Sequence, residues 1–414
     1  MPTSTSSTSE QPSYTLLTLA GTRPELLKLA PVIKALQAPG SRVTTKTCFS
    51  GQHVELLESV LGGLGVVPDL DLRVGSVERT LTSSLAWILE RIEAVVKDMQ
   101  PDGIIVQGDT NTALAGAMVA HHCEIPSFHV EAGLRTPNPR RPFPEEMNRR
   151  LIGRMAALHF VPTQRARGNL LAEGIEPSTI LLTGNTAIDA LHAHGRQHNA
   201  VAEEIIAKLD PNRRRLLITL HRRENLNVVP NVILAVEQIL AEHDDVEILW
   251  ILHLNGIRKA VCRAFDSTDR VTLVEPQAYG TFAKLMKRAD FILTDSGGVQ
   301  EEAPAFGTPV LVLRDETERP EAVEAGASRI VGGDTEKIVT ACRELLSDEE
   351  LYRSMSRPTS PFGDGRASER IATALERYYL PDAGIRRPES VRPDSFPESI
   401  LHSLPPDAGP VEHN

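Results

Sequence analysis

Two acidic residues stand where apolar runs of the sequence give way to polar residues, and a third opens a predicted helix. Asp109 comes soon after the run Gly103–Val106, and Glu131 directly follows Ser127–Val130, while Glu145 begins the helix. In open α/β sheets, ligands bind beyond the carboxyl ends of the strands, so acids at matching ends of neighbouring elements can surround one reacting carbon. The pattern therefore indicates general acid–base chemistry.

Glu145 has a second interpretation. A carboxylate at a helix start can cap free N–H groups, and the helix dipole stabilises it there. Adjacent helical residues diverge by about 100°, so at most one of Glu145 and Glu146 faces a given site. A catalytic and a capping role both stay open for Glu145.

Two other segments have the composition of anion-binding turns. In Gly21-Thr22-Arg23-Pro24-Glu25, and with Lys28 one turn later, two cations stand beside a helix N-terminus. In Asp295-Ser296-Gly297-Gly298, a turn between a strand and a helix can aim backbone N–H groups at a phosphate. Glu302 lies one turn further, at a distance suited to ribose hydroxyls. The alternatives are a solvated Arg23 and an ordinary tight turn at the glycines.

The second half of the chain adds a basic segment. His221-Arg222-Arg223 follows the apolar run Leu216–Leu220. If this run is a strand, an imidazole and two guanidinium groups lie over the same cleft from its other side.

These segments need a scaffold that brings strand ends together. In both halves, short apolar runs rich in β-branched residues alternate with stretches of helical length, which is typical of βαβ units around parallel sheets. A length of 414 residues suggests two domains, and we place the change near residues 184–190. The predicted strands are Tyr14–Ala20, Val43–Phe49, Gly103–Val106, Ser127–Val130, Leu158–Val161, Ile180–Thr183, Leu216–Leu220, Val246–Leu252, Val271–Val274, Phe291–Thr294 and Pro309–Leu313.

The bulk composition argues against several classes of protein. No apolar run reaches the roughly 18–20 residues of a membrane span, and Met1–Ser13 lacks the apolar segment of a signal peptide, so we expect a cytoplasmic protein with no membrane partner. The net charge of −11 disfavours a nucleic-acid partner. Neither a disulfide framework nor a zinc site is suggested by the widely spaced cysteines Cys48, Cys123, Cys262 and Cys342.

Taken together, the motifs resemble the non-hydrolysing UDP-N-acetylglucosamine 2-epimerases, in that family's order and spacing, over roughly residues 14–380. The segments that carry the resemblance are Gly21-Thr22-Arg23-Pro24-Glu25, Gly108-Asp109-Thr110, His129-Val130-Glu131-Ala132-Gly133-Leu134-Arg135, Pro144-Glu145-Glu146, Gly184-Asn185-Thr186, His221-Arg222-Arg223-Glu224, Thr294-Asp295-Ser296-Gly297-Gly298 and Glu318-Arg319-Pro320-Glu321.

The resemblance implies an α/β fold in which two Rossmann-like domains face a cleft, the GT-B architecture, with a last helix at Arg366–Tyr379 crossing back to the first domain. We predict a first domain over 14–185, completed by the returning helix at about 366–380, and a UDP-binding domain over 186–365. Residues 1–13 are Ser/Thr-rich and residues 381–414 contain seven prolines, so we expect both to be disordered. A homodimer is also expected.

Members of the family interconvert UDP-N-acetylglucosamine and UDP-N-acetylmannosamine without NAD, by eliminating UDP to give 2-acetamidoglucal and adding it back. The resemblance therefore implies a UDP-sugar substrate and no cofactor or metal. By motif position, Asp109, Glu131 and Glu145 match the catalytic carboxylates, and His221 matches a histidine near the diphosphate. The positions that match UDP-holding residues are Arg23, Lys28, Gln277, Phe282, Ser296, Gly297, Gly298, Glu302 and Arg319.

The sequence departs from the family pattern at three places. Val54 stands where bacterial members often carry Arg in a second, regulatory substrate site, which puts activation by substrate in doubt, although Gln52, His53 and Arg73 can still form part of such a site. Gly256 replaces a frequent Pro, and Gln107 replaces a common His before Gly-Asp.

Four rival functions fit the sequence less well than a non-hydrolysing epimerase does. A hydrolysing 2-epimerase shares the fold but tends to carry Arg after Gly-Asp, where this chain has Thr110. A GT-B glycosyltransferase gives no reason for three clustered acids; Asp69-Leu70-Asp71 resembles a transferase metal pair, but we interpret it as a surface loop. An NAD-dependent epimerase needs Gly-x-Gly-x-x-Gly after the first strand, and this is absent. A non-catalytic sensor would be marked by loss of the acids, and all three are present.

Overall fold

The computed structural model describes residues 13–51, 65–72, 80–140, 142–195, 198–222, 225–252 and 255–379. Apart from Ser13, the two predicted terminal extensions lie outside these ranges. The predicted regulatory residues Gln52, His53 and Arg73 also lie outside them.

The first half of the chain forms a seven-stranded parallel sheet in the order β3-β2-β1-β4-β5-β6-β7. Side chains of β1 point alternately into two apolar clusters, with Leu16 in one and Leu17 in the other, as expected for a strand buried on both faces. The strands are β1 (Tyr14–Ala20), β2 (Val43–Phe49), β3 (Leu70–Asp71), β4 (Gly103–Gln107), β5 (Ser127–Val130), β6 (Leu158–Val161) and β7 (Ile180–Leu182).

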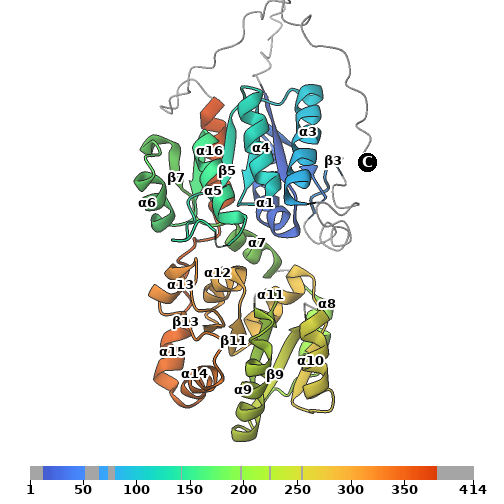
Figure 1. Cartoon of the computed structure of the whole chain (residues 1–414), viewed down its shortest axis with the longest axis vertical. Coiled ribbons are helices and arrows are strands. Elements are labelled where there is room, and N and C mark those ends of the chain that lie inside the picture. The colour runs from blue at the N-terminus through green and yellow to red at the C-terminus, as the bar shows by residue number, and fades with distance from the viewer. Residues whose placement is uncertain are drawn as a thin grey trace, which may run out of the picture.

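Helices cover both faces of this sheet (Figure 1). Residues of α3 and α4 pack in the cluster that contains Leu17, and residues of α1 and α7 pack in the cluster that contains Leu16. The helices of this half are α1 (Arg23–Leu36), α3 (Leu81–Met99), α4 (Asn111–His122), α5 (Glu145–Met155), α6 (Gln164–Ala172) and α7 (Thr186–Gly195).

The second half forms a six-stranded parallel sheet in the order β10-β9-β8-β11-β12-β13. Its strands are β8 (Arg214–Leu220), β9 (Val246–Leu252), β10 (Val271–Val274), β11 (Phe291–Thr294), β12 (Val310–Val312) and β13 (Ser328–Ile330). Its helices are α8 (Ala200–Ile206), α9 (Val229–Glu242), α10 (Asn255–Phe265), α11 (Tyr279–Arg288), α12 (Gly297–Phe306), α13 (Pro320–Glu324), α14 (Thr335–Ser347) and α15 (Glu349–Met355).

Helix α16 (Ala367–Tyr379) returns from the second domain to the first. Ile371 and Leu375 are fully buried in the same apolar cluster as residues of α1. The hydroxyl of Tyr379 donates to the carbonyl oxygen of Asp102 at 2.8 Å, and its ring stacks on Tyr14 with ring centres 4.4 Å apart. The predicted fold class is therefore confirmed, including the helix that crosses back.

Two strands were missed, and one of them, β3, lies in the segment that we interpreted as a surface loop; both of its residues are exposed, so only the loop part of that interpretation was wrong. Leu70 and Asp71 form the edge strand β3, because the Asp69 carboxylate accepts hydrogen bonds from Lys46 Nζ and the Thr47 backbone, both at 2.8 Å, and so holds this segment against β2. Strand β13 was also missed. Two of its three residues are exposed, so it lacks the apolar run that marks the other strands.

All four cysteines have free thiols, and two of them, Cys48 and Cys342, are buried. Burial raises the pKa of both to about 12. Among the helices of the described residues, none combines the length and apolar character that crossing a membrane requires.

The packing of α16 gives a test of its structural role. Leu375→Ala should lower the free energy of unfolding by about 2–5 kcal/mol, because a fully buried leucine leaves a cavity when it is truncated. Thr373→Ala, on the exposed side of the same helix, is the matched control and should change it by less than about 0.5 kcal/mol. Denaturant unfolding followed by circular dichroism measures both. Equal losses in the two variants would show that α16 is not part of the core.

Candidate active site

The buried carboxylate of Glu25 fixes the conformation of the turn between β1 and α1. Its Oε2 accepts hydrogen bonds from the backbone N–H groups of Gly21 at 3.0 Å and Thr22 at 2.7 Å. Its Oε1 accepts one from the Thr110 hydroxyl at 2.7 Å, which ties this loop to the turn that carries Asp109. Burial raises the pKa of Glu25 to about 7. A side chain at Gly21 would meet the Thr112 hydroxyl at 2.1 Å, so only glycine fits there.

Glu131 is buried at the end of β5, where the two domains meet. Lys28 Nζ binds its Oε1 at 2.5 Å, and Asn185 Nδ2 donates to the same oxygen at 3.1 Å. Gln107 donates to its other oxygen. Burial alone would raise the pKa of Glu131, but the positive charges of Lys28 and Arg319 lower it below its usual value, so the group is held as a carboxylate.

Asp109 is fixed by helix α5. Arg149 binds its Oδ2 through Nε at 2.8 Å and Nη2 at 2.6 Å. The amide of Asn148 donates to the Asp109 carbonyl oxygen at 2.8 Å. The two neighbouring residues of α5 therefore hold both the main chain and the side chain of Asp109.

Glu145 and Glu146 have different environments, as the helical geometry requires. Glu146 is fully buried and accepts hydrogen bonds from the Thr136 backbone and from Arg149, each at 3.1 Å, and from Arg150 at 3.0 Å. Glu145 is only partly buried, and the N-cap residue of α5, Pro144, makes no side-chain cap hydrogen bond. Burial and the nearby Asp109 raise the pKa of Glu145. Glu146 thus serves the structure, and Glu145 remains accessible.

On the second domain, His221 follows β8 and lies against Asp295, which follows β11. The ring Nδ1 of His221 is 3.0 Å from Oδ1 of Asp295. The Asp295 carboxylate is completely buried, whereas 43% of the His221 side chain is exposed. Burial alone would raise the pKa of Asp295, but its hydrogen bonds to His221 and to the Arg222 backbone lower it below the usual value.

A chain of charged groups continues from Glu131 into the second domain. The Asn185 amide also donates to Glu301 Oε2 at 3.0 Å, and Lys28 Nζ lies 3.7 Å from the same oxygen. Arg319 binds Glu301 through Nε at 2.7 Å and Glu318 through Nη1 at 2.5 Å. Each of these charges has a partner of opposite sign, as burial demands.

The residues matched to UDP binding lie at several places around this junction. Arg23 Nη2 donates to the Gln277 carbonyl oxygen at 3.2 Å, across the domains. Ser296 caps α12, and Phe282 lies partly buried on α11. Glu302 is buried on α12, and burial together with neighbouring Glu301 raises its pKa to about 8. Lys28, in contrast, is turned to Glu131.

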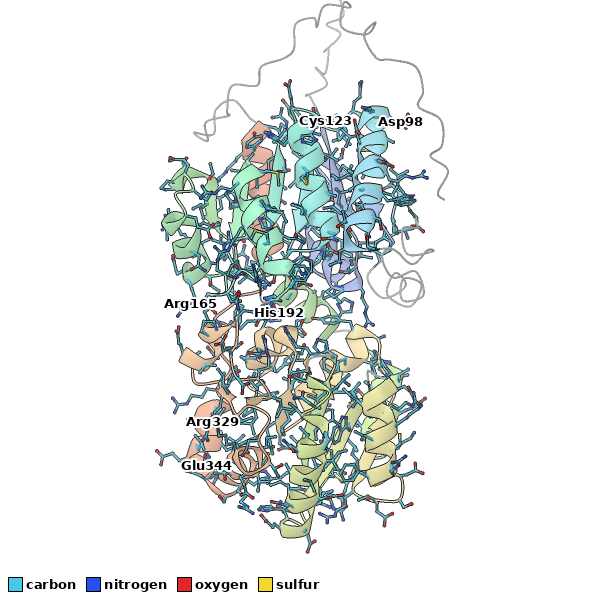
Figure 2. The ribbon with its side chains drawn as sticks, viewed as in Figure 1. Asp98, Cys123, Arg165, His192, Arg329 and Glu344 are labelled. Carbon is cyan, nitrogen blue, oxygen red and sulfur yellow. The ribbon has the colours of Figure 1, made fainter. Side chains whose placement is uncertain are left out.

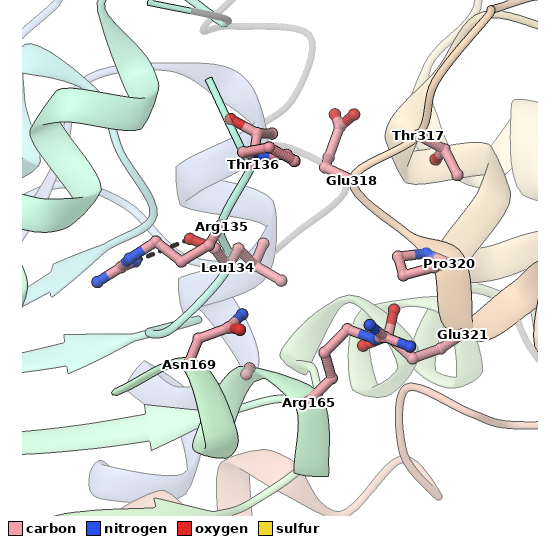
Figure 3. Close-up of a pocket in the computed structure, with 11 residues that line it drawn as sticks. Leu134, Arg135, Thr136, Arg165, Asn169, Thr317, Glu318, Pro320 and Glu321 are labelled. Atoms are coloured by element: carbon pink, nitrogen blue, oxygen red, sulfur yellow. Dashed lines mark hydrogen bonds between the residues drawn. The ribbon is translucent and has the colours of Figure 1, made fainter. Parts of the chain in front are cut away.

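A cavity of about 420 Å³ lies between the two domains. Figure 3 shows Arg135, Arg165 and Asn169 on one side and Glu318 and Glu321 on the other. In Figure 2, Arg165 lies at the level where the domains meet. None of the predicted catalytic residues lines this cavity, but Arg135 comes four residues after Glu131 and Glu318 directly precedes Arg319. The cavity is therefore next to the linked charges of Glu131, Glu301 and Arg319 and does not contain the predicted catalytic residues.

Several residues of this site have no role in the sequence-based prediction. Asn185, Asp295 and Glu318 stand in motifs that carry the family resemblance, but the sequence does not say what they contact. Arg149 was missed, and its i,i+3 spacing from Glu146 on α5 is the signal that could have found it. Within the described residues, no group of three or more His, Cys, Asp or Glu side chains is arranged to hold a metal ion.

Known proteins resemble this chain along most of its length. Residues 34–376 match the model of the family described as UDP-N-acetylglucosamine 2-epimerase. The chain belongs to this family. It is 42% identical to the UDP-N-acetylglucosamine 2-epimerase of Bacillus subtilis over 92% of this chain and 98% of that one, and 43% identical to the enzyme of the same name from Escherichia coli K12 over 87% and 98%.

A solved structure of a family member has the same fold. The crystal structure of UDP-GlcNAc 2-epimerase from Neisseria meningitidis bound to UDP-GlcNAc superimposes with a TM-score of 0.83 at 39% identity, covering 87% of this chain and 99% of that chain. The predicted family is therefore confirmed.

Two buried histidines beside the site make stability depend on pH. His129, whose Nε2 lies 2.8 Å from the Gly108 carbonyl oxygen, and His159 on the next strand are each 1% exposed. Burial lowers the pKa of His129 to about 3 and that of His159 to about 4. The unfolded chain protonates both near their ordinary pKa of about 6.5, so unfolding takes up protons below that pH.

We therefore expect these two histidines to lower the free energy of unfolding as the pH drops from about 6.5 to about 4, whereas Glu25 and Glu302, whose pKa values are raised, act in the opposite direction. Near pH 5, His159→Phe should reduce this slope by up to about 1.4 kcal/mol per pH unit, which corresponds to one proton. Denaturant titrations at a series of pH values measure the slope. A variant with the wild-type slope would mean that His159 is not held neutral.

Proposed function

We propose that this protein interconverts UDP-N-acetylglucosamine and UDP-N-acetylmannosamine by eliminating UDP and then adding it back at carbon 1, with the proton delivered to the opposite face of carbon 2. The observation that carries the proposal is that Asp109 and Glu131 follow the neighbouring strands β4 and β5 of the first sheet, with Glu145 near Asp109 and Glu131 near Arg319 of the second domain. The names of the relatives, and the UDP-GlcNAc bound to the Neisseria structure, support the same substrate.

The chemistry explains why several acids are needed. In the elimination, the hydrogen on carbon 2 leaves as a proton, the bond from carbon 1 to the phosphate oxygen breaks, and UDP departs with that electron pair. In the return step, a proton adds to the opposite face of carbon 2 and UDP re-forms its bond to carbon 1. One group must accept a proton and another must supply one.

The environments of the acids suit these two tasks. Glu131 is held as a carboxylate by Lys28 and is fit to accept a proton. Glu145, whose pKa is raised by burial and by Asp109, is fit to supply one. Groups whose surroundings move their pKa values apart are a common basis for paired acid–base roles.

UDP must be retained between the two steps, and residues of both domains serve this purpose in the proposal. We assign the diphosphate to Arg23, His221, Arg319 and the backbone of Ser296-Gly297-Gly298, and the nucleoside to Gln277, Phe282 and Glu302. Lys28 forms an ion pair with Glu131, so it can bind UDP only if its ammonium group contacts the carboxylate and the diphosphate at the same time. The proposal needs neither NAD nor a metal ion.

The mechanism makes a direct prediction for enzyme incubated with UDP-N-acetylglucosamine in deuterated water. Proton NMR should show equilibration with UDP-N-acetylmannosamine and loss of the carbon 2 proton signal, because deuterium from the solvent replaces that proton. Prior dialysis against EDTA should leave the rate unchanged. Stoichiometric release of free N-acetylmannosamine would identify a hydrolysing enzyme instead, and activity that returns only with added magnesium would contradict the metal-free mechanism.

The acids themselves can be separated by their effects on stability and turnover. Asp109→Asn, Glu131→Gln and Glu145→Gln should each lower kcat by at least about a hundredfold, the loss typical of a missing general acid or base. For Glu145→Gln, melting temperature and UDP affinity should stay near those of the wild type. Glu146→Gln is the matched neighbour, and it should lower stability by about 1–3 kcal/mol because its buried partners lose a charged acceptor.

Coupled product assays, thermal melts and calorimetric titration with UDP give the three quantities. If Glu145→Gln melts lower but turns over within about threefold of the wild type, Glu145 is only a helix cap, and the acid–base pair reduces to Asp109 and Glu131.

A further inference from the structure

The carboxylate of Asp295 joins the ends of β8 and β11. Its Oδ1 accepts a hydrogen bond from the His221 backbone N–H at 3.1 Å and lies 3.0 Å from the ring Nδ1 of the same residue. Its Oδ2 accepts hydrogen bonds from the Arg222 backbone N–H at 3.0 Å and from the Asn225 amide at 3.1 Å. Asp295 thus fixes both the main chain and the imidazole of His221.

We propose that Asp295 is a positioning residue for His221, and that it keeps the imidazole proton on Nδ1 and so leaves Nε2 as the acceptor nitrogen. An ionised carboxylate only accepts hydrogen bonds, so Nδ1 must be the donor. Nε2 is then the acceptor nitrogen of a side chain that is 43% exposed. This inference rests on the proposed function, in which His221 acts at the diphosphate.

A carboxylate in this position has two consequences for the ring. It selects one tautomer and one orientation, and it stabilises the positive charge that the ring gains when Nε2 takes up a proton. A proton that Nε2 has taken up from solvent can pass to the phosphate oxygen as UDP departs, and that oxygen gives the proton back to Nε2 when UDP re-forms its bond to carbon 1.

The hydrogen-bond pattern predicts what Asp295→Asn does to the ring. An asparagine side chain has one acceptor oxygen and one NH₂ group. Two obligate donors, the Arg222 N–H and the Asn225 amide, face the Oδ2 position. The His221 backbone N–H faces Oδ1 at 3.1 Å but also lies 3.3 Å from Oδ2, so the oxygen should occupy the Oδ2 position. The NH₂ group then faces His221 Nδ1, which can accept its hydrogen bond only without a proton. The substitution should therefore move the ring proton to Nε2.

Nitrogen NMR of histidine-labelled protein measures the tautomer directly. Signals of His221 are assigned by their loss in His221→Gln. In the wild type we expect a protonated Nδ1 and an unprotonated Nε2, and in Asp295→Asn we expect the reverse. Asp290→Asn is the matched control: Asp290 precedes β11 as Asp295 follows it, and its carboxylate accepts a hydrogen bond from the Arg215 backbone at 2.7 Å, at the opposite end of β8. This control should keep the wild-type tautomer.

Kinetics then test whether the tautomer matters. Asp295→Asn should lower kcat by at least about a hundredfold while UDP affinity changes by less than about threefold. Combined with His221→Gln, the substitution should cause no further loss, because Asp295 acts through the ring. Asp290→Asn should keep wild-type kcat.

Either of two results would overturn the proposal: a wild-type His221 with its proton on Nε2, or losses from His221→Gln and Asp295→Asn that multiply in the double variant. The first is measured on wild-type protein and so does not depend on whether Asp295→Asn folds. It also requires no turnover. A wild type that fails to epimerise therefore refutes the proposed reaction and leaves the tautomer result standing by itself.

Discussion

The carboxylate of Glu131 is buried where the two domains meet, and a charge in such a place needs a partner, since an unpaired buried charge costs several kcal/mol. Lys28 supplies that partner from α1, and the same ammonium group approaches Glu301 on α12 of the other domain. Asn185, at the start of α7, bonds both carboxylates. Charge pairing at this point therefore joins the two domains, and it brings the Glu131 carboxylate close to Arg319 of the second domain.

The backbone at Glu131 is also locally strained. Glu131 has a φ of 64°, a left-handed conformation that typically costs an ordinary residue about 1–2 kcal/mol. Gly133 follows at 85°, and a side chain there would meet the Ala166 carbonyl oxygen at 2.3 Å. The chain thus turns sharply after β5, which lets the Glu131 carboxylate point back across the sheet edge to Lys28. Strain of this kind persists because the surrounding hydrogen bonds hold it, and it is common at functional sites.

Most of the fold could be predicted from local patterns in the sequence. Seven of the predicted strands, Tyr14–Ala20 among them, have the predicted bounds, because strands buried on both faces read as continuous apolar runs. The exposed edge strands β3 and β13 have no such run. The site was harder, since its contacts join distant segments: Asn185 and Glu301 are 116 residues apart, and His221 and Asp295 are 74 apart. Residue type and position after a strand can identify each candidate side chain separately. Which partner it contacts is set only when the two domains pack together.

The pairing also bears on how an anionic substrate can enter a site already rich in acids. Lys28 and Arg319 each bind two carboxylates, so a diphosphate that approached either of them would compete with an existing ion pair. Arg23 is different: its guanidinium donates to the neutral carbonyl of Gln277. A phosphate at Arg23 would gain a charge-assisted hydrogen bond in exchange for a neutral one, and the exchange is favourable because charged pairs are about twice as strong. Since Arg23 and Gln277 belong to different domains, an anion bound there would replace a contact that holds the domains together, so under the proposed function substrate binding and the relative position of the two domains are coupled.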